Sequence, residues 1–371
     1  MSQSAAFGIV GGYGATGRVV VSELLKSCEG EIVVGGRDPA KLKTLAAEFG
    51  SRVSTAHLDV LDARSLDEFC RRCSIIVNCG GPVMRLQDRV AQAAFRGHCH
   101  YVDPAGMTFV VERMRHKSQE IADLGFCFVV SAGWMPGISE VVALYAHAQA
   151  LRQMDAVDSL AVYYGDAGEW SVNALRDAVW YIRKLGIHSP GYFHKGRWAL
   201  LSRSAALSTA NLGNPIGTGR FGIFFTPELN EVGGQLHDCN VRAYSYVSGS
   251  RAILASILIA LLPLPEGLGV RLLRNVFRRN RRLPVGGFVV AQAIGHSQAR
   301  RRAVTVQTIF EAGRDYWIHG VAMATAARMV AEGKGVQRGV HFLADAVDPE
   351  AFLTRLRAAG VEQTETSELC E

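Results

Sequence analysis

Residues 6–17 read Ala-Phe-Gly-Ile-Val-Gly-Gly-Tyr-Gly-Ala-Thr-Gly. Its first five residues have the apolar composition of a short buried strand. Gly12, Gly14 and Gly17 then follow in G-x-G-x-x-G spacing, and a helix is predicted directly after them. A strand that passes through such a loop into a helix is the context in which this pattern binds a dinucleotide. The alternative is a glycine-rich turn without a ligand.

The three glycines have different tasks in a dinucleotide site. Gly12 permits the tight turn, Gly14 lets the backbone approach the pyrophosphate, and Gly17 lets the helix pack on the strand. The first amides of the helix then face the phosphates, where the helix dipole favours negative charge. The cofactor contacts predicted in this loop are Gly12, Tyr13, Gly14, Ala15, Thr16 and Gly17.

The end of the second predicted strand, 31–35, indicates which dinucleotide is bound. Gly36 and Arg37 stand where an acidic residue would bond the ribose hydroxyls of NAD. A small residue followed by Arg suits the 2′-phosphate of NADP, and Lys41 adds a second positive charge. Asp38 is expected to cap the next helix. The alternative is that Arg37 is a solvated turn residue and Asp38 bonds the ribose.

Strands and helices alternate as far as residue 131. Further strands are predicted at 53–58, 74–79, 100–103 and 126–131, and helices at 18–27, 39–49, 63–70, 85–96 and 109–124. This alternation predicts an α/β domain with a doubly wound parallel sheet of the Rossmann type. Because ligands bind outside the carboxyl ends of such strands, the later strand ends add cofactor contacts at Asp59, Val60, Cys79, Gly80, Gly81 and Pro82.

After about residue 136 the pattern changes to longer, aromatic-rich strands. Strands are predicted at 157–164, 192–201, 219–225, 239–247, 288–294 and 304–310, and helices at 172–185, 253–262 and 269–279. This indicates an α+β domain with a mostly antiparallel sheet. The tail returns to helix at 320–332 and 349–359. We therefore expect a Rossmann domain at 1–135, a substrate and dimerisation domain at 136–312, and a helical segment at 313–371 that packs back on the first domain.

Composition bounds the protein class. The chain has 371 residues, 49% hydrophobic and 20% charged, which is ordinary globular usage. The longest apolar run, 253–264, is shorter than the roughly 20 residues that span a bilayer. The N-terminus has no basic segment of a signal peptide. Eight scattered Cys predict reduced thiols and a cytoplasmic protein. The C-x-x-C at 70–73 and the His-Cys-His at 98–100 are interpreted as buried strand and helix ends, so no metal is predicted.

The net charge of +6 comes from one segment. Residues 271–302 hold nine Arg and no Asp or Glu, which leaves the rest of the chain at 6 − 9 = −3. This local patch excludes a general nucleic-acid-binding surface. The apolar helix before it has three interpretations: a helix in the core or in a dimer interface, contact with an anionic membrane, and contact with an acidic carrier protein. The first is preferred.

The assembled motifs resemble the saccharopine dehydrogenase-like family. They are Gly11-Gly12-Tyr13-Gly14-Ala15-Thr16-Gly17, Gly36-Arg37-Asp38-Pro39-Ala40-Lys41-Leu42, Asn78-Cys79-Gly80-Gly81-Pro82, His100-Tyr101-Val102-Asp103 and Gly133-Trp134-Met135-Pro136-Gly137-Ile138-Ser139. The resemblance implies an NADP-linked reductase, often dimeric, with a substrate domain inserted into the Rossmann domain. Members reduce an imine or run the reverse oxidation, and related branches act on other unsaturated bonds, including enoyl groups of lipids. Met135 replaces an acidic residue of the amino-acid-metabolising members, which favours a more apolar substrate than saccharopine.

The resemblance also suggests the catalytic residues. Its Tyr-Val-Asp element places Asp103 against the substrate amine, where a carboxylate would stabilise iminium charge. Tyr101 and His100 are weaker candidates for proton donation, and strand alternation puts only Tyr101 on the face of Asp103. The alternative for Asp103 is an Asx turn before Pro104. The substrate contacts are predicted at Gly106, Met107, Trp134, Met135 and Pro136.

The sequence therefore predicts an NADPH-dependent reductase of a C=N bond, with a small-molecule substrate that is cyclic or carried by an acidic carrier protein. A homodimer is expected, nucleic acid is not a partner, and membrane association is the less favoured option. The alternatives are an enoyl or ketone reductase of the same fold and a dinucleotide-binding regulatory protein without turnover.

Overall fold

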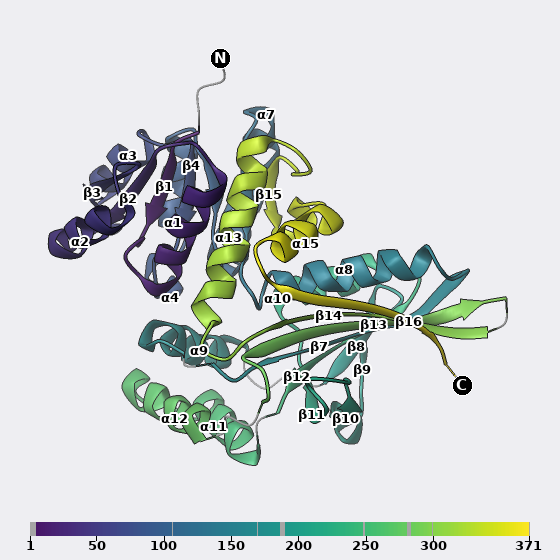
Figure 1. Ribbon diagram of the computed structural model, residues 1–371. Coiled ribbons are helices and arrows are strands. Elements are labelled where there is room, and N and C mark those ends of the chain that lie inside the picture. Colours follow the sequence, from purple (N-terminus) through teal and green to yellow (C-terminus); the bar gives the residue numbers. More distant parts are fainter. Residues whose placement is uncertain are drawn as a thin grey trace. The chain divides into compact units, whose positions relative to one another are not determined.

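The computed structural model describes residues 5–105, 107–168, 170–185, 190–247, 249–279, 283–298 and 300–370. These residues form two compact units (Figure 1). The first unit comprises residues 1–138 and 316–359, and the second comprises 139–315 and 360–371. The chain thus leaves the first unit, builds the second, and returns before its last strand.

The first unit is built on a parallel sheet of seven strands. They are β1 (Phe7–Val10), β2 (Ile32–Gly36), β3 (Val53–His57), β4 (Ile75–Asn78), β5 (His100–Val102), β6 (Cys127–Val130) and β15 (Gly339–Phe342). Their order is β15-β6-β5-β4-β1-β2-β3, and every pairing is parallel. The order reverses between β1 and β4, which makes their carboxyl ends the switch point where α/β sheets bind ligands. The predicted Rossmann-type sheet is confirmed.

Helices of several lengths accompany these strands. They are α1 (Ala15–Ser27), α2 (Pro39–Phe49), α3 (Ala63–Cys70), α4 (Val83–Leu86), α5 (Arg89–Arg96), α6 (Glu112–Met114), α7 (Ser118–Asp123), α13 (Asp315–Glu332), α14 (Leu343–Ala346) and α15 (Pro349–Ala358), with a π-helix, Met107–Val111, and a 3-10 helix, Arg115–Lys117, around α6. Asp38 caps α2, as predicted, because its side chain accepts from the N–H groups of Ala40 and Lys41. The helix predicted at 85–96 is interrupted at Gln87, which has a positive φ of 52°.

The second unit is built on a mixed sheet. Its strands are β7 (Ala156–Asp166), β8 (Gly191–His194), β9 (Arg197–Leu200), β10 (Leu207–Asn211), β11 (Thr218–Ile223), β12 (Asn240–Tyr246), β13 (Gly287–Ser297), β14 (Arg300–Phe310) and β16 (Glu362–Leu369). The order along the sheet is β10-β11-β12-β7-β13-β14-β16, with the β8–β9 hairpin attached to β12. Within the described residues β12 and β7 pair in parallel and the other neighbours are antiparallel. The predicted α+β character is confirmed.

Helices of the second unit are α8 (Ile138–Leu151), α9 (Val172–Leu185), α10 (Pro227–Gln235), α11 (Ser250–Leu261) and α12 (Glu266–Arg279), with a 3-10 turn at Arg203–Ala206. Side chains of α9, α11 and α12 form one apolar cluster of Leu175, Val179, Ile259, Val270 and Leu273. No helix in the described parts of the chain is long and apolar enough to cross a membrane.

The closing segment differs from the expectation of helices that pack on the first domain. It also contains β15, which joins the first sheet beside β6, and β16, which pairs antiparallel with β14 in the second unit. Strand β16 was not predicted because its sequence, Glu-Gln-Thr-Glu-Thr-Ser-Glu-Leu, lacks the alternation of apolar and polar residues that indicates a strand. An edge strand that is mostly exposed needs none.

Candidate functional site

The glycine loop after β1 has the geometry of a phosphate cradle. A Cβ on Gly17 would lie 2.6 Å from the backbone of Gly11 and Gly12, so the fold itself requires this glycine. A Cβ on Gly14 would approach only the carbonyl oxygen of Gly11, at 3.2 Å. Gly14 is also the N-cap of α1 and supplies no side-chain cap. The N-terminal amides of α1 therefore open onto a surface that suits an anion, and the residues fit a dinucleotide pyrophosphate.

A second loop lies against the first at the switch point. A Cβ on Gly11 would come within 3.3 Å of the Cys79 carbonyl oxygen and of Gly80 Cα, and the Cys79 N–H donates to the Val10 carbonyl at 2.9 Å. The structure thus brings two predicted sets of cofactor contacts together, the residues after β1 and those after β4. The second set consists of Cys79, Gly80, Gly81 and Pro82.

The carboxyl end of β2 carries the residues predicted to select the dinucleotide. A Cβ on Gly36 would lie 2.2 Å from the Tyr13 ring, so Gly36 makes room for this tyrosine. Lys41 Nζ lies 5.6 Å from the centroid of the same ring and 3.4 Å from the Asp38 carboxylate. The Lys41 amide and side chain lower the pKa of Asp38 below its usual value. Arg37 is exposed beside this group, and its guanidinium is accessible to a ligand at the sheet edge.

The predicted contacts after β3 lie at the same edge of the sheet. Asp59 and Val60 are both part-buried. The Asp59 side chain accepts from the N–H of Leu61 at 3.0 Å, while its own N–H donates to Ser65 Oγ at 3.3 Å. Asp59 therefore shapes the turn that leads into α3.

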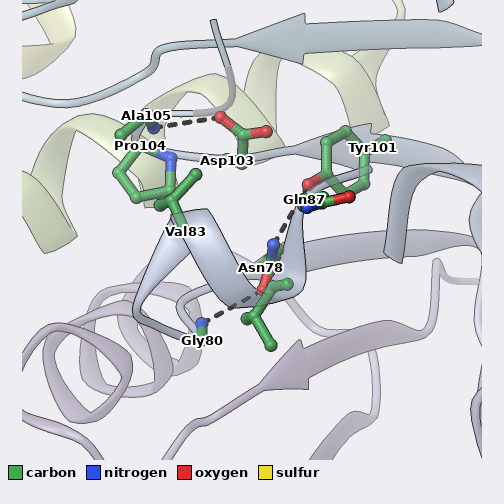
Figure 2. A pocket seen from close by; sticks show the side chains of 9 residues that line it. Asn78, Gly80, Val83, Gln87, Tyr101, Asp103, Pro104 and Ala105 are labelled. Carbon is green, nitrogen blue, oxygen red and sulfur yellow. Dashed lines mark hydrogen bonds between the residues drawn. The ribbon is translucent and has the colours of Figure 1, made fainter. Parts of the chain in front are cut away.

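A pocket adjoins the loop after β4 (Figure 2). It is a small pocket that is partly open to solvent. The lining comes from the ends of β4 and β5, the loops after them, and α4; the residues are Asn78, Gly80, Val83, Leu86, Gln87, Tyr101, Asp103, Pro104 and Ala105. Two of the three predicted catalytic residues, Tyr101 and Asp103, thus meet one of the predicted cofactor residues, Gly80.

Polar groups of this pocket form a connected network. Asn78 Oδ1 accepts from the Gly80 N–H at 3.1 Å, and Asn78 Nδ2 donates to Tyr101 Oη at 3.1 Å (Figure 2). Burial raises the pKa of Tyr101 well above its usual value, and the charge of Asp103 and its hydrogen bond add to this rise. Tyr101 therefore keeps its proton at neutral pH. Asn78 was not among the predicted functional residues, although its place at the end of a strand before Cys-Gly-Gly-Pro could have identified it.

Asp103 is buried at the end of β5 and is held by backbone amides. It is 2% exposed, and its Oδ1 accepts from the N–H groups of Ala105 at 3.0 Å and Ser131 at 3.2 Å. The first bond is the Asx turn considered as the alternative in the sequence analysis. Ser131, at the end of β6, has a positive φ of 62°. Both amide donors stabilise negative charge on this carboxyl group, which faces the pocket beside Tyr101 (Figure 2).

His100, the third catalytic candidate, is not brought into the pocket. It begins β5, and its Nδ1 accepts from the N–H of Cys127 at 3.0 Å, at the start of β6. Burial, helped by the charge of Arg338, lowers the pKa of His100. Its ring packs edge-on against Phe126, with 5.4 Å between the centroids. His100 therefore links two strand starts at the amino edge of the sheet, away from the carboxyl edge where Asp103 lies.

The turn at residues 133–138 after β6, called the crossover turn here, contains three of the predicted substrate contacts: Trp134, Met135 and Pro136. Gly133 N–H donates to the Pro136 carbonyl at 3.2 Å, and Ile138 N–H donates to the Gly133 carbonyl at 3.0 Å. Gly137 has a φ of 129°, and a Cβ there would lie 2.5 Å from two carbonyl oxygens. Trp134 is 2% exposed and does not line the pocket.

The remaining substrate predictions have mixed outcomes. Met135 is part-exposed in the crossover turn and Pro136 is buried. Met107 begins the π-helix, and its side chain is not described. Gly106 lies outside the described residues.

His319 on α13 is a residue that the sequence analysis missed. Its Nδ1 accepts from the Trp134 N–H at 3.2 Å, and the same atom lies 2.9 Å from the position of a Cβ on Gly133. Burial lowers the pKa of His319 to about 4, so the ring is neutral and Nδ1 remains an acceptor. The next residue, Gly320, packs against Val19 of α1. One turn of α13 therefore connects the crossover turn with the first helix.

The C-x-x-C and His-Cys-His segments contain buried thiols. Cys99 Sγ donates to the carbonyl oxygens of Cys70 and Cys73, each at 3.1 Å, and burial raises the pKa of Cys99 and of Cys73 to about 12. Elsewhere among the described residues, one group has ligand atoms within 4.8 Å of one another: His147, Asp238 and Cys239 in the second unit. Its His147 Nε2 lies 2.7 Å from Asp238 Oδ2, within hydrogen-bonding distance.

Comparison with known proteins agrees with this geometry. Residues 7–134 match the family model of the saccharopine dehydrogenase NADP binding domain. The lipid droplet localized protein of Caenorhabditis elegans is 31% identical over 137 residues, which cover 34% of this chain and 32% of that protein. The human saccharopine dehydrogenase-like oxidoreductase is 25% identical over 190 residues, which cover 46% of this chain and 43% of that protein. The chain thus spans less than half the length of these two relatives.

Among solved structures, the apo saccharopine dehydrogenase (L-Glu forming) of Saccharomyces cerevisiae shares the fold. It superposes with a TM-score of 0.68 at 14% identity and covers 98% of this chain and 100% of that chain. The resemblance predicted from the sequence motifs is confirmed. Residues 7–134 form an NADP-binding domain of the saccharopine dehydrogenase type, and the chain shares the fold of the yeast saccharopine dehydrogenase.

Proposed function

We propose that this chain, which carries an NADP-binding domain of the saccharopine dehydrogenase type, reduces a C=N bond of an apolar imine. The observation that carries the proposal is the position of Asp103: a carboxyl group in a largely apolar pocket, next to the loop after β4 and to the phosphate cradle. NADPH supplies the hydride when it is bound.

The chain's own residues supply the rest of the site. Reduction adds a hydride to the imine carbon and leaves a proton on nitrogen, so a protonated imine is the better acceptor. Asp103 stabilises that positive charge, since its Oδ1 is already oriented by two amides. The low exposure of Asp103 strengthens this electrostatic effect because little water screens it. Val83, Leu86 and Pro104 favour an apolar substrate.

Tyr101 supports a second candidate function, the reduction of an enoyl or ketone group. Its phenol is buried and keeps its proton, which makes it a donor to an oxygen that gains negative charge. In an imine reductase the same phenol orients Asp103. The two reactions therefore differ in which residue is indispensable, Asp103 for a cationic substrate and Tyr101 for an oxyanion.

The deciding experiment follows NADPH fluorescence with three substrate sets: mixtures of amines and aldehydes or ketones, α,β-unsaturated thioesters, and ketones alone. We expect the first set to consume NADPH. Asp103→Asn keeps an acceptor for both amides but loses the charge, so kcat/KM should fall about 100-fold, or about 2.7 kcal/mol, with unchanged NADPH affinity. Asp123→Asn, an exposed acid on α7, is the matched control.

Other outcomes select other functions. Turnover of thioesters or ketones that is within twofold of wild type in Asp103→Asn supports the second candidate. NADPH binding without turnover of any set supports a regulatory protein. The homodimer and the acidic carrier protein expected from the sequence remain predictions.

A further inference from the structure

Helix α11 presents a row of large apolar side chains to solvent. Ile253 is 39% exposed, Leu254 56%, Ile257 38% and Leu261 66%. Their spacing of i, i+1, i+4 and i+8 places them on one face of the helix. Ile259 on another face is fully buried in the cluster with α9 and α12. The interpretation of this segment as a core helix therefore holds for one face only.

Two further exposed leucines follow α11 in the sequence. Leu262, directly after α11, is 45% exposed, and Leu268 in the first turn of α12 is 43% exposed. Soluble monomers rarely expose contiguous apolar patches of this kind unless another surface covers them. We call these six residues, Ile253, Leu254, Ile257, Leu261, Leu262 and Leu268, the leucine face.

Exposed arginines lie on the same two helices as the leucine face. Arg251 in the first turn of α11 and Arg271 and Arg274 on α12 are exposed. From residue 250 to residue 277, the charged residues are Arg251, Glu266, Arg271 and Arg274, and Glu266 pairs with Arg176 at 3.0 Å. The two helices that carry the leucine face therefore have an excess of positive charge.

This combination distinguishes the candidate occupants. A second copy of the chain would place the same arginines against each other across a two-fold axis, which costs energy. An acidic protein surface would pair with the arginines, but its charge does not account for the six exposed aliphatic side chains. A lipid bilayer with anionic headgroups satisfies both at once.

We propose that α11 and α12 form a peripheral membrane-docking surface. The leucine face enters the boundary between headgroups and acyl chains, and Arg251, Arg271 and Arg274 bind lipid phosphates. Neither helix spans the bilayer. This inference does not depend on which bond the chain reduces.

Co-sedimentation of the full chain with vesicles tests the proposal. We expect binding to vesicles of phosphatidylcholine with phosphatidylglycerol, little binding to phosphatidylcholine alone, and weaker binding as salt rises. The double variant Leu254→Ser/Leu261→Ser should bind at least about tenfold more weakly. Arg271→Glu/Arg274→Glu should lose most of the preference for anionic vesicles.

Matched control variants distinguish binding through this surface from nonspecific binding to vesicles. Leu200→Ser changes a leucine that is 71% exposed on β9, and Arg64→Glu reverses an exposed charge on α3, so both should bind vesicles as wild type does. NADPH affinity and melting temperature should be unchanged in all four variants. The proposal is overturned if wild type ignores anionic vesicles, or if the leucine variant binds them normally. It is also overturned if that variant converts a dimer to a monomer by sedimentation velocity, because the face would then bind a second copy.

Discussion

Asn78 Nδ2 donates a hydrogen bond of 3.1 Å to Tyr101 Oη, and the same amide accepts from the N–H of Gly80 through Oδ1. Asn78 therefore connects the loop after β4, next to the phosphate cradle, with the side of the pocket that is lined by Tyr101 and Asp103. Because an amide cannot donate through its oxygen, the orientation of Asn78 is set by Gly80, and Asn78 in turn positions the Tyr101 phenol.

Removal of that phenol should affect turnover more than cofactor binding. Tyr101→Phe preserves the ring contact with Phe128, whose centroid is 5.5 Å away, but leaves Asn78 Nδ2 without its acceptor. We expect kcat/KM for an imine to fall about tenfold, as for loss of one hydrogen bond that orients Asp103, and NADPH affinity to stay within threefold. A fall of about 100-fold would instead favour an enoyl or ketone substrate, for which the phenol donates the proton. Steady-state kinetics and fluorescence titration measure the two quantities. Tyr145→Phe on α8 is the control, and an equal loss in both variants would contradict a role in the pocket.

Arg37 should set the preference for NADPH over NADH. Its guanidinium is exposed at the end of β2 beside Lys41, where a 2′-phosphate would be bound. We expect wild type to bind NADPH at least tenfold more tightly, about 1.4 kcal/mol, and Arg37→Ala to lose most of that difference. Titration of both nucleotides measures it, with Arg64→Ala as the control. Equal affinities in wild type would show that selection lies elsewhere.

Two glycines of the same loop should respond differently to substitution. Gly14→Val should abolish NADPH binding while the melting temperature changes little, because a Cβ there meets only one backbone atom, at 3.2 Å. Gly17→Ala should lower the melting temperature, since its Cβ would lie 2.6 Å from backbone atoms of Gly11 and Gly12. Thermal unfolding with and without NADPH measures both. Normal binding by Gly14→Val would place the phosphates outside this loop.

His319 should make the free energy of unfolding sensitive to acid. The unfolded chain protonates this ring below about pH 6.5, whereas the folded chain does so only near its lowered pKa of about 4. Stability from this group is therefore full above about pH 6.5 and falls as pH decreases toward 4, by up to about 3 kcal/mol. Protonation of Nδ1 also removes the acceptor for the Trp134 N–H.

Comparison of variants isolates the effect of His319. His319→Asn keeps an acceptor without the titration, so its free energy of unfolding should depend less on pH than that of wild type. The two proteins are compared at each pH because a second group also titrates in this interval. Burial raises the pKa of Asp166 to about 6, so protonation of Asp166 increases the free energy of unfolding as pH falls, opposite to the effect of His319. Denaturant unfolding between pH 4 and 7.5 measures both proteins, and parallel pH profiles would remove His319 as their cause.

Local patterns in the sequence were enough for the elements that are apolar and flanked by turn signals. The helices 39–49, 63–70 and 172–185 have the predicted bounds. Two elements were missed because their sequences lack the periodic pattern of apolar and polar residues. Helix α8 is apolar on most sides because it is buried nearly throughout, and strand β16 is polar because it lies at a sheet edge.

Local sequence patterns predicted the Rossmann-type sheet and put the glycine loop, Tyr101 and Asp103 near its carboxyl edge, because these features depend on residues close together in the chain and on the shared edge of parallel strands. Strand alternation had already separated His100 from Asp103 and Tyr101, and the tertiary structure added the partner of His100, the Cys127 N–H at the start of β6. The tertiary structure also shows that backbone contacts require Gly17 whereas Gly14 has more open space, and it shows which face of α11 is exposed. These outcomes depend on contacts between segments far apart in the chain, such as Trp134 with His319, and no local pattern contains them.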